Sequence, residues 1–350
     1  MHMSECSFRD GRIVSDYGVP YFVAEVNSSH NGNVETARKM IDAAADIGAD
    51  CVKFQSWSAA SLYSKTYYDE NPIAKRFVER FALTSTQLKE MADYARAQGI
   101  EFSSTPYSEE EVDFLLEECR APFLKIASME LNNPRFLSYI GRKRVPLVLS
   151  TGMGTMEEIR RAVQTLEDAG AEEICLLHCI SIYPTKVETL NLRNILGLRK
   201  EFPHFPIGFS DHTEDDAAAV AAVTLGAALI EKHLTLDRSK VGMDNGMATE
   251  PEPFRKLIDK CRMVQMGLGS EEREVFPEEL AQRRKMRRSV VVVKDLPAGH
   301  VLCAEDLYAK RPGTGIPPDR IELLVGKTLR RAVKEDTLLQ EDDILEDGIR

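Results

Sequence analysis

The sequence lacks the features that mark secreted, membrane-spanning and nucleic-acid-binding proteins. No apolar run approaches the roughly 18 residues that a membrane span needs, and the opening MHMSECSFRDGR lacks a signal peptide's apolar stretch. The seven cysteines are scattered, odd in number and without a CxxC motif, which is typical of reduced thiols in a cytoplasmic protein. The net charge of -11 disfavours nonspecific binding to nucleic acid or to anionic membranes.

Short apolar runs alternate with helical patterns through most of the chain. Of the 350 residues 43% are hydrophobic, and this length predicts two domains or one large barrel with an appendage. Glycine follows three of the helical patterns, at Gly48, Gly170 and Gly226, where it suits a left-handed helix cap. Strands are expected at 21–26, 51–55, 101–104, 123–126, 146–150, 174–178, 207–210 and 229–233, with helices such as 34–47, 84–97, 156–169, 216–224 and 252–268 between most of them.

Eight strands in strict alternation with helices, within roughly 250 residues, predict an α/β fold of the (β/α)8 TIM-barrel type. A doubly wound sheet is the alternative, but no GxGxxG follows the first strand. Beyond residue 270 the sequence becomes highly charged, and then turns into a β-branched run (289–293) and turn-rich segments. We therefore predict a barrel domain over 1–285, including a linker helix from about 271, and a small mostly-β domain over 286–350.

All eight predicted strands end in polar residues, at the end of a barrel where active sites lie. Parallel strands are buried on both faces, so charged residues there need a functional or structural reason. Pairs spaced by two point to one face of a strand. The strand ends carry Glu25 and Asn27, Lys53 and Gln55, Ser103 to Thr105, Lys125 with Ser128 and Glu130, Ser150, His178 with Ser181 and Tyr183, Ser210 to His212, and Glu231 to His233.

His212 and His233 end neighbouring strands, so their imidazoles are expected to meet over the barrel mouth. Two histidines with open positions suit a divalent transition metal, whereas a hydrogen-bonded structural role is the alternative. A thiol nucleophile at Cys179 beside His178 is disfavoured, because adjacent strand residues point to opposite faces.

Lys53 and Lys125 allow two interpretations. They are either structural charges paired with Glu25 or Glu231, or two cations that bind a substrate with phosphate and carboxylate groups. Small hydroxyl residues and glycines at 150–154 are compatible with an anion site at a strand-to-helix turn, and equally with a simple turn.

A series of motifs in order along the chain resembles the sialic acid synthases, which include the legionaminate and pseudaminate synthases and the spore-coat polysaccharide E proteins. The resemblance covers nearly the whole chain, and the set is highly specific although no single motif is. The motifs are AEVNSSHNG (24–32), VKFQ (52–55), SSTPYS (103–108), LKIASMELNN (124–133), LSTGMGT (149–155), LHCISIYPT (177–185), GFSDHT (208–213), EKHLT (231–235) and KRPGTGIPP (310–318).

The resemblance implies a (β/α)8 barrel followed by an antifreeze-like (SAF) domain. It implies a condensation of phosphoenolpyruvate with an open-chain, N-acetylated amino sugar, giving a nonulosonic acid and phosphate for surface polysaccharide biosynthesis. It also implies a divalent metal, manganese or magnesium, on His212 and His233, and a proton-handling carboxylate at Glu25. A homodimer is expected, in which the tail of one chain covers the barrel of the other and Arg311 reaches the partner's sugar site.

The other site residues follow from the same resemblance, position by position. Those expected to bind phosphoenolpyruvate are Lys53, Thr105, Lys125, Ser128, Ser150 and Ser210, and those expected near the sugar are Gln55, Glu130, Ser181, Tyr183 and Asp244.

The departures from the family pattern fall mainly at positions that are expected to lie near the sugar. Ser181 replaces the asparagine of sialic acid synthases proper, 242–251 reads GMDNGMATEP, and Asn27-Ser28-Ser29-His30 replaces Gly-x-Asn-His. The donor is therefore the better-defined substrate, and the acceptor need not be N-acetylmannosamine. Two alternatives stay open: a Schiff-base aldolase or lyase using Lys53 or Lys125, and a non-catalytic sugar-binding descendant.

Overall fold

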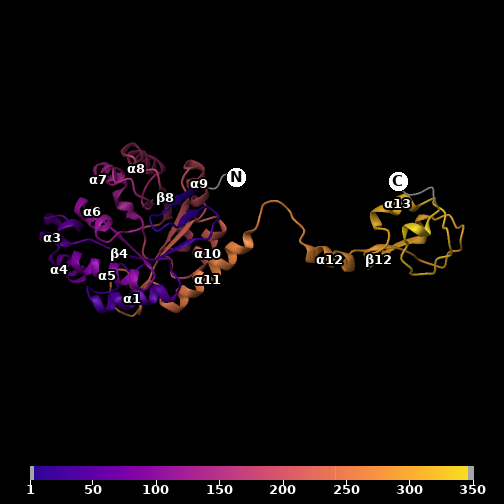
Figure 1. The fold of residues 1–350 in the computed structure, drawn as a ribbon, viewed down its shortest axis with the longest axis horizontal. Helices are drawn as coiled ribbons and strands as arrows, with labels where there is room; N and C mark the ends of the chain where they lie inside the picture. Colours follow the sequence, from indigo (N-terminus) through magenta and orange to yellow (C-terminus); the bar gives the residue numbers. More distant parts are fainter. Residues whose placement is uncertain (1–3, 241, 346–350) are drawn as a thin grey trace. The chain divides into compact units, whose positions relative to one another are not determined.

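The computed structural model describes residues 4–240 and 242–345. The chain divides into two compact units, Met1–Gly269 and Ser270–Arg350, and each is described by itself. Figure 1 shows the strands of the first unit at its centre with helices around them. In the described residues no helix is long and apolar enough to cross a membrane.

The first unit is a nearly closed barrel of parallel strands, as predicted. The strands follow the order β5-β4-β3-β10-β9-β8-β7-β6, and Ser103 Oγ of β5 donates to the carbonyl of Phe123, beside β6, at 3.1 Å. Each strand was located from the sequence to within one or two residues. Their bounds are β3 (Tyr21–Glu25), β4 (Cys51–Gln55), β5 (Glu101–Thr105), β6 (Leu124–Ile126), β7 (Leu147–Ser150), β8 (Ile174–Cys179), β9 (Ile207–Asp211) and β10 (Leu229–His233).

Helices connect the strands and cover their outer face. Local signals fix their ends: Thr155 and Glu158 form a capping box at the start of α8, and Gly170 ends it at φ 108°. A short helical insert, α2 to α4, follows β4 and was not predicted. The helices are α1 (Val34–Asp46), α2 (Ala59–Leu62), α3 (Lys65–Glu70), α4 (Pro72–Phe81), α5 (Ser85–Ala97), α6 (Glu109–Glu117), α7 (Pro134–Gly141), α8 (Met156–Ala169), α9 (Asn194–Glu201), α10 (Ala217–Thr224) and α11 (Pro251–Leu268).

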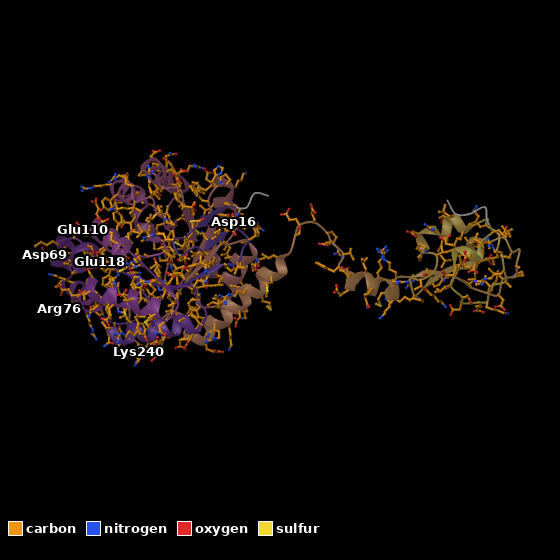
Figure 2. The ribbon with its side chains drawn as sticks, in the orientation of Figure 1. Asp16, Asp69, Arg76, Glu110, Glu118 and Lys240 are labelled. Carbon is orange, nitrogen blue, oxygen red and sulfur yellow. The ribbon has the colours of Figure 1, made fainter. Side chains whose placement is uncertain are left out.

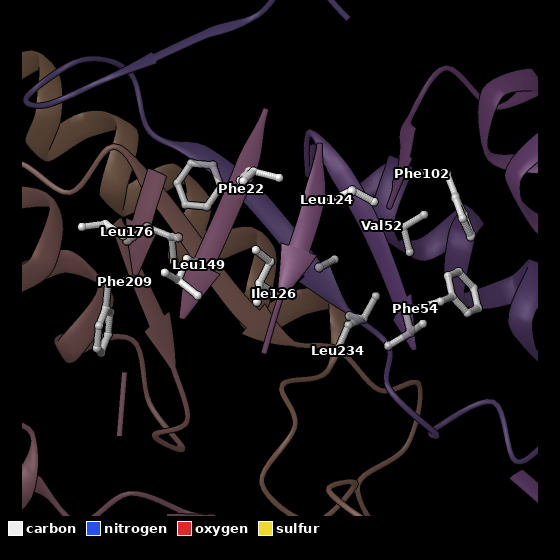
Figure 3. Close-up of a cluster of buried hydrophobic side chains, with 14 of the residues drawn as sticks. Phe22, Val52, Phe54, Phe102, Leu124, Ile126, Leu149, Leu176, Phe209 and Leu234 are labelled. Carbon is white, nitrogen blue, oxygen red and sulfur yellow. The ribbon is translucent and has the colours of Figure 1, made fainter. Parts of the chain in front are cut away.

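Alternate residues of each strand point into two different environments, one between the strands and the helices and one inside the barrel. Phe22, Val52 and Phe54 belong to the large apolar cluster between strands and helices, part of which Figure 3 shows. Their neighbours Val23 and Cys51 belong to a separate apolar cluster that also contains residues of β7, β8 and β10 and, at the edge of β6, Phe123. Side chains alternate between the two faces of a strand, so the residues two positions after Val23 and Cys51 also point inward. These positions, nearer the carboxyl ends of the strands, hold polar groups.

An N-terminal hairpin, β1 (Glu5–Ser7) and β2 (Ile13–Ser15), packs on this second cluster, which includes Cys6, Phe8 and Val14. The Phe8 ring lies 5.1 Å from that of Tyr21 and 4.7 Å from that of Phe123. Beyond β2, the Asp16 carboxylate accepts from Arg199 Nε at 2.7 Å. Figure 2 labels Asp16 on one side of the barrel unit and Lys240, in the loop after β10, on another. Sequence reasoning did not predict this hairpin.

The second unit is small and mostly β, as predicted. It begins with the exposed helix α12 (Pro277–Met286), followed by β11 (Ser289–Val292), which pairs antiparallel with β12 (Leu307–Lys310), and it contains the short helix α13 (Ile321–Leu324). Its own core includes Val290, Leu302 and Leu339. The buried Asp306 carboxylate accepts from the backbone N–H of Cys303 at 3.1 Å and contacts Lys294 and His300.

Candidate active site

A cavity of about 350 Å³ opens at the carboxyl ends of the barrel strands. The structure brings all the predicted site residues together there except Glu130 and Arg311. They are Glu25, Lys53, Gln55, Thr105, Lys125, Ser128, Ser150, Ser181, Tyr183, Ser210, His212, His233 and Asp244.

Two lysines and two carboxylates form the floor of this cavity. Lys53 Nζ contacts Glu25 Oε2 and lies 3.6 Å from Glu231 Oε2. Lys125 Nζ lies 3.8 Å from Glu231 Oε1. All four side chains are at most 6% exposed, so their charges interact in a medium of low dielectric constant. The lysines are thus paired with carboxylates, and they also line the cavity. Binding of an anionic substrate by them stays a prediction.

The two carboxylates of the floor differ in their acid–base properties. Burial, reinforced by the charge of Glu231, raises the pKa of Glu25 to about 7 against the opposing effect of Lys53. Burial alone would also raise the pKa of Glu231, but Lys125 and Lys53 together lower it below its ordinary value. Glu231 therefore stays ionised, while Glu25 can exchange a proton near neutral pH.

Hydroxyl groups surround the two ammonium groups. Lys125 Nζ donates to Ser150 Oγ at 2.7 Å, and Lys53 Nζ donates to Thr105 Oγ1 at 3.2 Å. Ser210 Oγ donates to Glu231 Oε1 at 2.9 Å. The backbone N–H of Gly152 donates to Ser128 Oγ at 2.9 Å. A substrate with two anionic groups would find cations and hydroxyl donors converging from five strand ends.

A chain of hydrogen bonds fixes the orientation of Glu25. Trp57 Nε1 and the Tyr107 hydroxyl donate to Gln55 Oε1 at 2.7 and 3.1 Å. The Gln55 amide group must then present Nε2 on its other side, and Nε2 donates to Glu25 Oε1 at 3.2 Å. The backbone N–H of Asn27 donates to the same oxygen at 2.9 Å. Oε1 is thus occupied by neutral donors, and Oε2 faces Lys53.

His212 and His233 lie side by side, with ring centroids 5.4 Å apart. His212 Nδ1 bonds to the carbonyl of Ile180 at 2.8 Å, and Nε2 lies on the other side of the ring, 3.5 Å from Ser210 Oγ. Burial lowers the pKa of both imidazoles, which favours the neutral form that binds metals. The described residues contain no group of three metal-ligating side chains. A metal ion on this pair would therefore need its remaining ligands from water and substrate.

The more exposed part of the cavity carries three of the five residues expected near the sugar, Ser181, Tyr183 and Asp244. Asn27 Nδ2 donates to Asp244 Oδ2, which links the loop after β10 to the end of β3. The Tyr183 ring packs against His212 at 4.3 Å between centroids and is 49% exposed. Ser181 also lines the cavity.

Two predicted residues do not line the cavity. Glu130 lies in the 3-10 helix Ser128–Asn132 and accepts from Asn133 Nδ2 at 2.8 Å. Arg311 belongs to the second unit, where it is exposed. The loop that follows it is fixed within that unit, because Ser289 Oγ donates to the carbonyl of Pro312 at 2.7 Å.

The neighbours His178 and Cys179 point in opposite directions, as expected. His178 Nε2 bonds to the carbonyl of Leu190 at 2.8 Å, and its ring stacks on Phe209. Cys179 instead lines the cavity, with Sγ 3.3 Å from Ser128 Oγ. The histidine cannot activate that thiol, so this arrangement does not support a cysteine nucleophile.

Several cavity residues were missed as candidates. The sequence suggests Glu231 only as a structural partner of Lys53 or Lys125, and Asn27 only as a polar strand end and a departure from a motif. Trp57 and Tyr107 each follow a strand by two residues, a position that could have suggested them. Their contact with Gln55 depends on the register of β4 against β5, which the sequence does not show.

Two models of known protein families match this chain. Residues 40–273 match the model of the NeuB family, and residues 287–345 match the SAF domain. The chain belongs to the NeuB family.

Relatives of the NeuB family resemble the chain over most of its length. It is 35% identical to the N,N'-diacetyllegionaminic acid synthase of Legionella pneumophila, over 91% of this chain and 93% of that protein. It is 34% identical to human N-acetylneuraminate-9-phosphate synthase, over 95% and 94%. The crystal structure of a Leptospira borgpetersenii N-acetylneuraminic acid synthetase in complex with citrate matches 80% of this chain and 96% of that chain, with a TM-score of 0.73 and 29% identity. The chain is therefore similar to synthases of sialic-acid-like sugars in both sequence and fold.

Proposed function

We propose that this NeuB-family protein condenses phosphoenolpyruvate with an open-chain, N-acetylated amino sugar to give a nonulosonic acid and phosphate. The observation that carries the proposal is the floor of the cavity. Two lysines, ringed by hydroxyl groups, lie beside two neutral histidines and a carboxyl group with a pKa near neutrality. These are groups for binding a doubly anionic donor, for a Lewis acid and for proton transfer, and they lie within one cavity.

The donor would lie over Lys53 and Lys125, with the hydroxyls of Ser150 and Ser210 completing the contacts of its phosphate and carboxylate. The bound donor is held close to the acceptor, so that its C3 carbon can form a bond with the aldehyde carbon. The aldehyde oxygen takes up a proton, which Glu25 supplies and later recovers from water, and becomes a hydroxyl group. The positive charge that develops at C2 lies near the carboxylates of the floor, which stabilise it.

Water then adds at C2, and the bond between C2 and the phosphate oxygen breaks. Glu25 accepts the proton of this water, because its pKa lies near neutrality. Gln55 and Asn27 hold its Oε1, so Oε2, which contacts Lys53, is the oxygen that takes up the proton. The C2 hydroxyl loses its proton as phosphate leaves, and a 2-keto-3-deoxy acid results. Every atom of phosphoenolpyruvate and of water is then accounted for in the acid and in phosphate.

We further propose a divalent ion, manganese or magnesium, on His212 and His233. Such an ion would supply Lewis-acid polarisation of the aldehyde oxygen. Removal of divalent ions by a chelator should abolish turnover, and readdition should restore it. His212→Ala removes a side chain that lines the cavity and loses its hydrogen bond to the carbonyl of Ile180, so it should lose turnover while the unfolding transition stays close to that of the wild type. Full activity after either change would contradict the metal role.

The remaining expectations belong to the same proposal. The protein would act in the cytoplasm, as a homodimer in which Arg311 of one chain completes the sugar site of the other. Mixing Arg311→Ala chains with His233→Ala chains should then restore part of the activity, because one site in each mixed dimer is intact. Mixed dimers that stay inactive would contradict a shared site.

The reaction is tested by following phosphate release from phosphoenolpyruvate with manganese and a panel of N-acetylated amino sugars. Release that depends on both the metal and one of the sugars is expected. The alternative, a Schiff-base aldolase, is tested by borohydride in the presence of a 2-keto acid. Covalent trapping on Lys53 or Lys125 would favour the aldolase, since the condensation forms no imine. Against the effect of burial, Glu231 and Glu25 raise the pKa of Lys53, which opposes imine formation there. Burial lowers the pKa of Lys125 against the effect of Glu231, so Lys125 is the lysine on which the trapping experiment decides.

A further inference from the structure

The loop after β10 is closed at its base and filled from within. At the base, the backbone N–H of Thr249 donates to the carbonyl of His233 at 2.8 Å. Inside the loop, the Asn245 side chain is 2% exposed, and its Nδ2 donates to the carbonyls of Asp237 and Lys240 at 2.7 and 2.8 Å. The loop is therefore compact in itself, and its base is fixed beside His233.

The tip of this loop, residues 242–244, is attached to the rest of the barrel by one contact. Met243 and Asp244 line the cavity, and Asp244 Oδ2 accepts a hydrogen bond from Asn27 Nδ2. Of the hydrogen bonds among the residues that the structure describes, this is the one that joins the tip to another segment of the barrel. The position of Asp244 at the cavity therefore depends on Asn27.

The backbone of Asn27 is itself fixed on both sides. Its N–H donates to Glu25 Oε1 at 2.9 Å, and its carbonyl is bonded to the buried imidazole of His30. Its φ of 42° lies in the left-handed region, which glycine and asparagine tolerate better than other residues. The sequence thus has an amide side chain at a turn where glycine would suit the backbone, and the fixed backbone directs this amide toward Asp244.

We propose that Asn27 is a positioning residue, which holds the loop after β10 so that Asp244 faces the cavity beside Glu25. The backbone of Asn27 fixes one carboxyl group and its side chain fixes the other. A carboxylate that is held before a ligand arrives binds it without the entropic cost of ordering a loop. The effect on catalysis rests on the proposed function, in which Asp244 lies near the acceptor sugar, whereas the effect on the loop does not.

Hydrogen exchange tests the effect on the loop without any substrate. The amides of Met247 and Ala248 donate to the carbonyl of Asp244 at 3.3 and 3.2 Å, so release of the tip should expose them to solvent more often. Asn27→Gly keeps the left-handed backbone and removes only the amide, and should speed exchange in residues 242–249 several-fold. Asn27→Asp places a second carboxylate against Asp244 and should speed it further. Unchanged exchange in both variants would overturn the proposal.

Asn191→Gly is the matched control. Asn191 also has a left-handed backbone, with φ 45°, but it is exposed and does not line the cavity. The same substitution there should change neither the exchange of residues 242–249 nor the kinetic constants. Equally fast exchange of the loop in this variant would show that the amide of Asn27 does not hold it, and would overturn the proposal.

Kinetics test the effect on the proposed site, with saturating phosphoenolpyruvate, manganese and the N-acetylated amino sugar that the wild type uses best. Asn27→Gly should lower kcat/KM for the sugar by about 10- to 100-fold, the equivalent of one hydrogen bond to a charged group. The loss should lie mainly in the KM for the sugar, and the KM for phosphoenolpyruvate should not change. In an Asp244→Ala background the same substitution should have no further effect.

A full additional loss in that background, or an equal rise in the KM for phosphoenolpyruvate, would overturn the positioning role while leaving the condensation established. If the wild type releases no phosphate with any sugar, in an assay that a known synthase passes, the proposed function fails. Hydrogen exchange then still decides whether Asn27 holds the loop.

Discussion

The two ends of the barrel interior are formed by the same strands but contain opposite kinds of side chain. At the carboxyl ends, the inward positions hold Glu25, Lys53 and Glu231, and two residues earlier on the same strands they hold Val23, Cys51 and Leu229. The carboxyl ends surround an open cavity, and the apolar cluster at the other end includes Phe8 of the N-terminal hairpin. A strand of five residues can thus contribute to chemistry with one end and to stability with the other.

This comparison predicts different roles for two buried lysines. Lys125, which faces the cavity, should matter for activity, and Lys232, on the outer face of β10, should matter for stability. Lys125→Met should lower kcat/KM by about 100- to 1000-fold, because it removes a preorganised charge from the site, and should change the unfolding transition little, since Glu231 keeps Lys53 and Ser210 as partners. Lys232 points to the outside of β10, where it bonds to Asp211 at 2.8 Å and is 1% exposed.

Lys232→Met is therefore the matched variant. It leaves the Asp211 carboxylate buried without its cation and should lower the free energy of unfolding by about 3–5 kcal/mol. The folded fraction should keep its activity at low temperature. Phosphate release and denaturant unfolding measure the two effects. Equal losses of activity and of stability in both variants would show that the two faces are not separate.

The hairpin end of the barrel should matter for stability alone. Phe8→Ala removes a ring that packs on Tyr21 and Phe123 and should lower the free energy of unfolding by about 3–5 kcal/mol. Ile13→Ala in the same hairpin is the control, because Ile13 is 59% exposed and its loss should be small. Thermal unfolding compares them, and a Phe8→Ala protein of unchanged stability but altered KM would contradict the division between the ends.

The smallest expected effect concerns the orientation of Glu25. Tyr107→Phe removes one of two donors to Gln55 Oε1 and should lower kcat by at most about tenfold, the equivalent of one hydrogen bond, with little change in the KM for phosphoenolpyruvate. Tyr139→Phe, which removes a hydroxyl bonded to Asp113 at 2.7 Å on α7, is the control. In a Glu25→Gln background the Tyr107 substitution should have no further effect. A full additional loss there would show that Tyr107 does not act through Glu25.

The sequence alone predicts those strands and helix ends that are determined by neighbouring residues in the chain. The alternation of apolar residues located β3 to β10, and Gly170 marked the end of α8 because a left-handed cap favours glycine. The hairpin escaped notice because β1 and β2 have three residues each and bury one residue apiece, Cys6 and Val14. A pattern of period two needs a longer strand to be visible.

In the site, too, the sequence predicts the positions of residues on strands but not the contacts between distant segments. The strand ends identified the polar floor, since the position of a residue on a strand determines which face it occupies. The contacts of Gln55 with Trp57 and Tyr107 depend on how two neighbouring strands are aligned and on loop conformation. Met129, Met153 and Met243 also line the cavity. They come from loops after three different strands, so only the folded chain brings them together.

The most direct test of the proposed chemistry follows one oxygen atom. Phosphoenolpyruvate is labelled with a heavy oxygen isotope in the bridge between C2 and phosphorus, and the phosphate released with manganese and an acceptor sugar is examined by mass spectrometry. Cleavage of the bond between C2 and oxygen, as we propose, places the heavy oxygen in every phosphate released. Unlabelled phosphate, with the heavy oxygen retained at C2 of the organic product, would mean that the bond to phosphorus breaks, and would contradict the condensation assigned to this barrel.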